Sequence, residues 1–211
     1  MIPNTFPSLT RWLAAALRTC ALAGAVACIG VRSSSNVAGV ATDGAPSAPV
    51  TLLYYTDYRC IACRAFAART LPALRRRYVE TGSLRIVARD LASDDGSRTI
   101  ANAARCAGEF GKYWAFHDSV SASLDPMTTA RLEQAAKSIG VPSDPFARCV
   151  GSGRYDAIIR TRAAAARADR IEGSLVVFVG RSTEHLNRIE IDADGRGLLQ
   201  IERLISGALE N

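Results

Sequence analysis

The sequence predicts an α/β fold in which a small mixed sheet is interrupted by one block of helices. Apolar, β-prone runs occupy residues 50–55, 84–91, 175–180 and 185–192. Between the second and third runs, residues 93–173 show helical periodicity and no convincing strand. A chain that passes through strand, helix, strand, helical block, two strands and a final helix is expected to pack a sheet against helices, with one helical insertion.

The first strand and the helix after it contain the most distinctive motif of the chain. Residues 50–55 (VTLLYY) form a continuous apolar run, which is typical of a strand buried on both faces. After a short loop, residues 60–82 show helical spacing, and Pro72 is expected to kink that helix. Cys60 and Cys63 form a Cys-x-x-Cys motif at the point where the strand gives way to the helix.

The later elements are predicted from periodicity alone. Within the helical block, residues 99–123 predict one helix or two, residues 127–141 a further helix that begins at a threonine cap, and residues 154–171 another. Beyond the block, a β-branched run at 175–180 and a second run after a turn predict two strands. Residues 198–210 are amphipathic and predict a closing helix.

The N-terminal 31 residues have the pattern of an export signal or a membrane anchor. Arg18 precedes an apolar stretch, residues 19–31, after which small and polar residues predominate. Cleavage after Ala27, lipidation of Cys28 and retention as an anchor are all compatible with this pattern. Each outcome predicts a periplasmic or other extracytoplasmic location. The next segment, residues 32–48, is rich in Ser, Gly, Ala and Pro and is predicted to be a flexible linker.

The composition argues against a nucleic-acid partner and favours disulfide chemistry. The formal net charge of +6 comes almost entirely from arginines spread along the chain, without a basic stripe interleaved with aromatic residues. An exported protein works in an oxidising compartment, where an even number of cysteines is typical of disulfide chemistry. The predicted folded part has four cysteines: Cys60, Cys63, Cys106 and Cys149.

The position of the Cys-x-x-Cys motif at a helix start predicts a redox-active pair. Unpaired backbone N–H groups and the helix dipole stabilise a thiolate at Cys60. Cys63 lies about one turn further on, close enough to resolve a mixed disulfide. Arg59 and Arg64 add positive charge nearby. Cys60 is therefore the predicted nucleophile and Cys63 the resolving thiol, and the reaction requires no bound cofactor.

Metal binding by the same two thiols is the alternative interpretation. Structural zinc sites normally have four ligands, and the chain has no second Cys-x-x-Cys pair. His117 and His185 are not spaced from each other or from the cysteines in a recognised ligand pattern. A copper carrier, which uses two thiolates and a soft third ligand, stays open. No other metal site is predicted.

Beyond the motif itself, much of the chain resembles the DsbA-like branch of the thioredoxin superfamily. The resemblance runs in order through YYTDYRCIACRAF, LPALRRRYVETGSLRIVARDL, AARCAGEFGKYWAFHDSV and IGVPSDPFARCV, and it extends from about Pro49 to Gly207. It implies a thioredoxin fold with a helical insertion domain. The implied order is an export signal or membrane anchor (1–31), a flexible linker (32–48), a thioredoxin-like domain (49–92 and 174–211) and an inserted helical domain (93–173).

The resemblance also implies an activity and its partners. Proteins of this branch are thiol-disulfide oxidoreductases, so Cys60 and Cys63 would exchange a disulfide with exported client proteins that carry cysteines. A membrane or periplasmic redox partner would then recycle the pair. Several relatives have a second, structural disulfide in the helical block, which here implies a bond between Cys106 and Cys149. That bond would close a loop of about 43 residues, which the chain-entropy model values at about 4 kcal/mol.

Leu175 is the main departure from the family pattern. Oxidoreductases of this fold place a cis-proline opposite the motif, and Leu175 stands at that position, directly after Ser174. In the family, the residue before the proline hydrogen-bonds an extended client, so Ser174 and Leu175 are the predicted client-binding groove. A cis bond before a residue other than proline costs about 2.5–4 kcal/mol, so a trans bond is expected here. The departure keeps open a different function: a redox-silent protein, or one that binds copper or zinc, on a thioredoxin scaffold.

Overall fold

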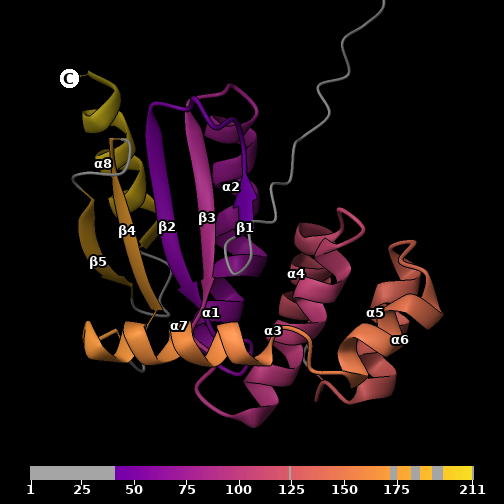
Figure 1. Ribbon diagram of the computed structural model, residues 1–211. Coiled ribbons are helices and arrows are strands. Elements are labelled where there is room, and N and C mark those ends of the chain that lie inside the picture. Colours follow the sequence, from indigo (N-terminus) through magenta and orange to yellow (C-terminus); the bar gives the residue numbers. More distant parts are fainter. Residues whose placement is uncertain (1–40, 124, 172–174, 182–185, 192–196, 211) are drawn as a thin grey trace, which may run out of the picture. The chain divides into compact units, whose positions relative to one another are not determined.

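The computed structural model describes residues 41–123, 125–171, 175–181, 186–191 and 197–210 (Figure 1). Every described residue belongs to one compact unit, within residues 32–211. The predicted export signal, with Cys28, therefore lies outside the described residues. Within the described ranges, no helix has the length and the apolar character needed to cross a membrane.

The described strands form one mixed sheet with the order β1-β3-β2-β4-β5. Their bounds are β1 Ala41–Asp43, β2 Val50–Thr56, β3 Leu84–Asp90, β4 Leu175–Arg181 and β5 Asn187–Ile191. β2 and β3 run parallel because a helix connects them, whereas the other neighbours are antiparallel. The central strand β2 is buried along nearly its whole length, as its continuous apolar run predicts. The predicted mixed sheet is thus confirmed.

The helix after β2 continues through Pro72 instead of ending there. It consists of α1 (Ile61–Ala65), a π-helical segment η1 (Phe66–Thr70), α2 (Leu71–Leu74) and a second π-helical segment η2 (Arg75–Val79). Pro72 lies at the start of α2, where the hydrogen-bonding pattern changes from π to α. Since proline donates no backbone hydrogen bond, such a change of pattern is where a helix can accommodate it.

Between β3 and β4, the described residues form five helices, which make up the insertion (Figure 1). They are α3 (Asp95–Gly108), α4 (Tyr113–Ala122), α5 (Thr129–Ser138), α6 (Ser143–Gly151) and α7 (Asp156–Ala168), and α8 (Gly197–Glu210) closes the chain. The insertion and the sheet share one apolar core, in which Tyr54 and Phe66 are packed together with Phe116 and Phe146. The site at the end of β2 is consequently held by both parts of the fold.

The predicted flexible linker is wrong at its C-terminal end. Ala41–Asp43 forms the edge strand β1, which pairs antiparallel with β3. The Asp43 carboxylate accepts a hydrogen bond from Arg75 Nε at 2.7 Å. Gly44 follows the strand and has φ +100°. A Cβ atom on this residue would lie 2.6 Å from the Leu84 carbonyl oxygen, so the position requires glycine. The segment around β1 is rich in Ala and Gly, as a linker is. An edge strand of three residues needs few apolar side chains, so its composition gives no strand signal.

A disulfide joins the two remaining cysteines of the described chain. Cys106, in α3, is bonded to Cys149, in α6, the pairing that the family resemblance implies. Both residues are 0% exposed. The bond therefore ties two helices of the insertion together inside the core.

Candidate functional site

The Cys-x-x-Cys motif lies where β2 passes into α1, as its sequence context predicts. Cys60 is the N-cap of α1 and has an extended backbone, with φ −75° and ψ 118°. The backbone N–H of Cys63 points back to Cys60 Sγ at 3.1 Å, and the N–H of Arg64 donates to the Cys60 carbonyl oxygen at 3.1 Å. An N–H group aimed at a sulfur stabilises that sulfur as a thiolate.

The two sulfurs of the motif are bonded to each other and differ in exposure. The structure contains a Cys60–Cys63 disulfide. Cys60 is partly exposed, whereas Cys63 is only 2% exposed. An incoming thiolate can therefore reach Cys60, while Cys63 is enclosed by the core.

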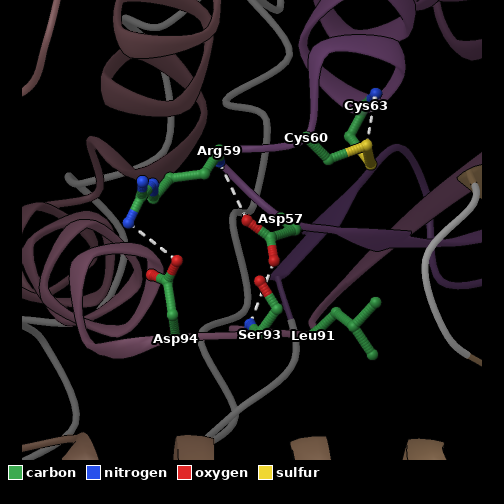
Figure 2. Close-up of a pocket in the computed structure, with 7 residues that line it drawn as sticks. All are labelled: Asp57, Arg59, Cys60, Cys63, Leu91, Ser93 and Asp94. Carbon is green, nitrogen blue, oxygen red and sulfur yellow. Dashed lines mark hydrogen bonds and ion pairs between the residues drawn. A yellow bond between two sulfur atoms is a disulfide. The ribbon is translucent and has the colours of Figure 1, made fainter.

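A pocket of about 350 Å³ opens beside the disulfide (Figure 2). Its walls come from the motif, from the loop before it and from the segment between β3 and α3, and its lining residues are Asp57, Arg59, Cys60, Cys63, Leu91, Ser93 and Asp94. Two carboxylates and one guanidinium are thus among the described groups that line the pocket beside the disulfide. The Arg59 guanidinium pairs with Asp94 at 2.7 Å, and both side chains are substantially exposed, so this ion pair contributes little to stability.

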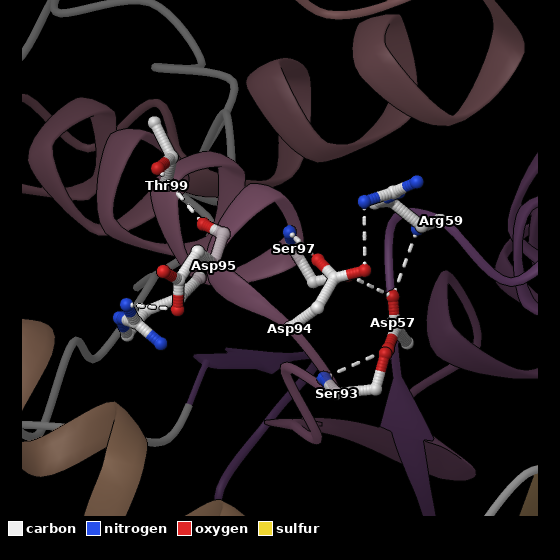
Figure 3. Close-up of polar contacts among 8 residues, drawn as sticks. Asp57, Arg59, Ser93, Asp94, Asp95, Ser97 and Thr99 are labelled. Atoms are coloured by element: carbon white, nitrogen blue, oxygen red, sulfur yellow. Dashed lines mark hydrogen bonds and ion pairs between the residues drawn. The ribbon is translucent and has the colours of Figure 1, made fainter.

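Asp57 is the best-connected polar side chain of the pocket and is 4% exposed. Its Oδ1 accepts the backbone N–H of Arg59 at 2.8 Å and the hydroxyl of Ser97, and its Oδ2 accepts the backbone N–H of Ser93 at 3.0 Å (Figure 3). Asp57 thereby fastens the loop before Cys60 to the start of α3. Burial alone would raise the pKa of Asp57, but the hydrogen bonds from Ser93, Ser97 and Arg59 outweigh it and lower the pKa below its ordinary value.

Replacing Asp57 by asparagine is expected to destabilise the fold by about 1–3 kcal/mol at neutral pH. An amide offers one acceptor oxygen where the carboxylate offers two, so a buried donor is left unpaired. Because folding lowers the pKa of Asp57, its ionisation stabilises the fold fully above the pKa of an unfolded aspartate. This contribution is lost as the pH falls through the lowered folded value. Urea unfolding of wild type and Asp57→Asn, from neutral pH into acid, should show the difference shrinking.

The matched control for this prediction is Asp95→Asn, because the Asp95 side chain is 91% exposed. Its effect should stay within about 0.5 kcal/mol. Equal effects of the two substitutions, or a difference that does not depend on pH, would contradict the role assigned to Asp57.

Ser174 and Leu175, the predicted client-binding groove, are not among the described residues that line this pocket. Ser174 is outside the described residues. Leu175 begins β4, pairs with Ile191 and is 1% exposed, so its side chain belongs to the core and does not line the pocket. The ladder between β2 and β4 ends at Tyr54 and Val177, before it reaches Leu175.

The histidines show no metal-binding arrangement where the structure describes them. His117 is 0% exposed, its Nε2 lies 2.8 Å from the Tyr54 hydroxyl, and its ring packs against Trp114 with centroids 5.4 Å apart. His185 is outside the described residues. Across the described part of the chain, no group of three or more His, Cys, Asp or Glu side chains could hold a metal ion.

The hydrogen-bonding partners of Asp57 were not identified from the sequence. A local signal was available, since an aspartate three residues before Cys60 falls in the loop between strand and helix, where its side chain can bind nearby backbone N–H groups. Asp94, which caps α3 by accepting from the Ser97 N–H at 2.8 Å, follows the usual cap preference. No spacing rule indicates that the two segments meet.

The sequence of the chain is similar to one protein family and to several named proteins. The family model described as Thioredoxin matches residues 36–186. The Na⁺/H⁺ antiporter NhaA 3 of Salinispora tropica is 30% identical over 145 residues, which is 67% of this chain and 22% of the antiporter. A Rickettsia prowazekii protein named as a candidate protein-disulfide oxidoreductase is 23% identical over 143 residues, 64% of this chain and 53% of that protein. The chain therefore spans about a fifth of the antiporter and about half of the rickettsial relative.

Solved structures share the fold at low sequence identity. Chlamydia trachomatis DsbA has a TM-score of 0.68 and 18% identity, covering 80% of this chain and 91% of that one. Oxidised BdbD from Bacillus subtilis has a TM-score of 0.67 and 18% identity, covering 81% and 92%. Wolbachia pipientis alpha-DsbA1 has a TM-score of 0.66 and 19% identity, covering 80% and 92%. The α/β fold with a helical insertion, predicted from the order of elements, is confirmed.

Proposed function

The chain belongs to the thioredoxin family, and from that membership we propose that it is an exported thiol-disulfide oxidoreductase that exchanges the Cys60–Cys63 disulfide with client proteins. One observation carries the proposal: a reachable sulfur and an enclosed sulfur, three residues apart, form a disulfide at a helix start. The name of the rickettsial relative and the DsbA structures of the same fold support it.

The exchange proceeds by two thiolate attacks. A client thiolate attacks Cys60 Sγ, so that a mixed disulfide forms and Cys63 leaves as a thiolate. A second client thiolate then attacks the client sulfur of the mixed disulfide, and Cys60 leaves as a thiolate that the Cys63 N–H stabilises. The client has lost two electrons and the motif has gained them. A membrane or periplasmic redox partner takes these electrons by the reverse sequence, and no bound cofactor is needed.

The burial of Cys63 determines its role in this scheme. When the motif acts as a reductant, Cys60 attacks a client disulfide and Cys63 resolves the mixed disulfide from within the same turn. Cys63 is 2% exposed, so client thiols rarely reach its sulfur. Its main reaction partner is therefore Cys60. We therefore assign Cys60 as the nucleophile and Cys63 as the resolving thiol. The direction of net transfer depends on the potential of the pair and on the recycling partner.

Export is part of the same proposal and is supported by the first 31 residues. Their charge, apolar stretch and small polar residues follow the signal pattern, and an oxidising compartment suits a protein with two disulfides. Fusion of residues 1–31 to a reporter enzyme that is active only outside the cytoplasm tests this part. Lipid labelling of wild type and Cys28→Ala distinguishes lipidation from simple cleavage.

The activity is tested with the purified protein in glutathione buffers. The Cys60–Cys63 pair is expected to equilibrate as a single two-electron couple, and the oxidised protein should introduce a disulfide into a reduced client protein. Free thiols are counted by alkylation and mass spectrometry, and bound metal is measured on the same sample. A pair that never equilibrates with glutathione, or stoichiometric copper or zinc on the thiols, would favour the redox-silent or metal-binding alternative that Leu175 raises.

A further inference from the structure

A second pocket, of about 500 Å³, is lined by residues of the helix that follows Cys60 and of α4. One wall is a single stripe along α1 and η1, formed by Ile61, Arg64, Ala65, Ala68 and Arg69. These positions are spaced i, i+3, i+4, i+7 and i+8, so they follow one face of the helix. The other wall is the C-terminal end of α4, at Ser121 and Ala122. We call this pocket the α1–α4 groove.

The lining of the α1–α4 groove combines an apolar surface with two cations. Ile61 is 80% exposed, more than the exposed Leu199 and Leu209, and the alanines add apolar surface beside it. None of the described residues that line the groove is acidic. Among the described residues, neither guanidinium makes a hydrogen bond or an ion pair, and Arg64 Nε is buried without a partner. Two arginines without a carboxylate partner in the described part of the chain favour an occupant that carries negative charge.

The groove begins one residue after Cys60 in the sequence. Ile61 directly follows Cys60, whose sulfur is the one that a client can reach. At about 1.5 Å of rise per residue, Arg64 lies about 6 Å and Arg69 about 14 Å along the helix from Cys60. An extended peptide advances about 3.3 Å per residue. Carboxylates about two and four residues from a client cysteine would therefore reach the two arginines.

We propose that the α1–α4 groove binds the segment beside the reactive cysteine of a client and selects acidic segments. Arg64 and Arg69 pair with client Asp or Glu side chains, while Ile61 and the alanines contact the apolar residues between them. This assignment rests on the proposed exchange activity and adds a substrate class to it. The groove differs from the predicted Ser174–Leu175 edge because it uses α1 and the insertion instead of β4.

The test compares reduced peptides that each contain two cysteines and differ only at the positions two and four residues beyond one of them. In the first set of peptides, both positions carry Glu, Gln or Lys. In a second set, the same residues lie at the corresponding positions on the other side of the cysteine pair. Peptide oxidation by the full-length oxidised protein is followed by mass spectrometry, with dithiothreitol as the uncharged reference substrate. Two partly exposed ion pairs predict that one Glu peptide is oxidised about tenfold faster than its Lys counterpart. The preference should collapse in about 1 M salt.

Charge reversal at Arg69 is the decisive variant. Arg69→Glu should remove the preference, because Arg64 still favours the Glu peptide while the introduced carboxylate favours the Lys peptide, and Arg69→Gln should leave an intermediate ratio. Arg76→Glu is the matched control, because Arg76 is exposed on the same continuous helix and does not line the groove. It changes the net charge equally and should leave the ratio unchanged. A ratio of rates is used because replacing an arginine can alter the reactivity of Cys60 toward every substrate.

The outcomes separate this inference from the proposed function. Oxidation of dithiothreitol with no difference between the Glu and Lys peptides overturns the acidic-segment proposal and leaves the exchange activity standing. An equal shift with Arg69→Glu and Arg76→Glu overturns it too, because net charge alone would then explain the preference. If neither dithiothreitol nor any peptide is oxidised, the exchange activity itself is wrong, and the inference fails with it.

Discussion

Cys60→Ser is expected to abolish disulfide exchange, with a loss of at least about a thousandfold in rate. A serine hydroxyl neither forms a disulfide nor is a thiolate-like nucleophile at neutral pH, so both directions of the reaction are lost. The measurement is oxidation of a reduced client protein, with the fold checked by circular dichroism. A variant that still exchanges disulfides at a substantial rate would show that another cysteine is the reactive one.

Cys63→Ser should give a different and complementary result. Cys60 remains reachable and can attack a client disulfide, but the enclosed thiol that resolves the intermediate is missing. Mixed disulfides between Cys60 and client proteins are therefore expected to accumulate, visible on non-reducing gels and absent from the Cys60→Ser variant. Accumulation with Cys60→Ser instead would exchange the roles assigned to the two cysteines.

Removal of the second disulfide is expected to cause the largest loss of stability. The double variant Cys106→Ala/Cys149→Ala opens a loop of about 43 residues and should lower the free energy of unfolding by about 4 kcal/mol. Both cysteines are replaced so that no unpaired thiol remains in the core. Urea unfolding of the oxidised proteins at neutral pH measures the difference.

The control for this loss is Cys60→Ala/Cys63→Ala. The Cys60–Cys63 disulfide, which this variant lacks, closes a loop of only three residues. The same chain-entropy relation gives about 2 kcal/mol for such a loop. An equally small loss in both double variants would mean that α3 and α6 are held together by packing rather than by the bond. Loss of exchange activity in Cys106→Ala/Cys149→Ala under conditions where it stays folded would give the second disulfide a chemical role.

The strands and the motif could be predicted because their signals are local. The apolar run of β2 and the helical spacing that begins at Cys60 both lie within one window of sequence, so periodicity was sufficient. β1 gave no such signal. It is three residues long and is held by pairing with β3 and by the contact between Asp43 and Arg75, partners 32 or more residues away.

The surroundings of the motif were harder to predict for the same reason. Asp57 meets Ser93 and Ser97 across 36 and 40 residues, and the α1–α4 groove exists only because the end of α4 lies beside α1. The spacing of residues along the chain carries no information about contacts between segments that are distant in sequence. The sequence could indicate which two cysteines form the candidate redox pair. The residues that orient this pair, and those proposed to contact a client, depend on how the insertion packs.

Asp57 also couples the local unfolding of two segments of the chain. The loop before Cys60 and the beginning of α3 are 30 or more residues apart in sequence, yet their amide protons from Arg59 and Ser93 share one carboxylate. A local fluctuation that frees one segment breaks the attachment of the other, so the two belong to the same cooperative unit in the native ensemble. The loop before the partly exposed Cys60 is therefore expected to open together with the start of α3, in which Ser97 is buried.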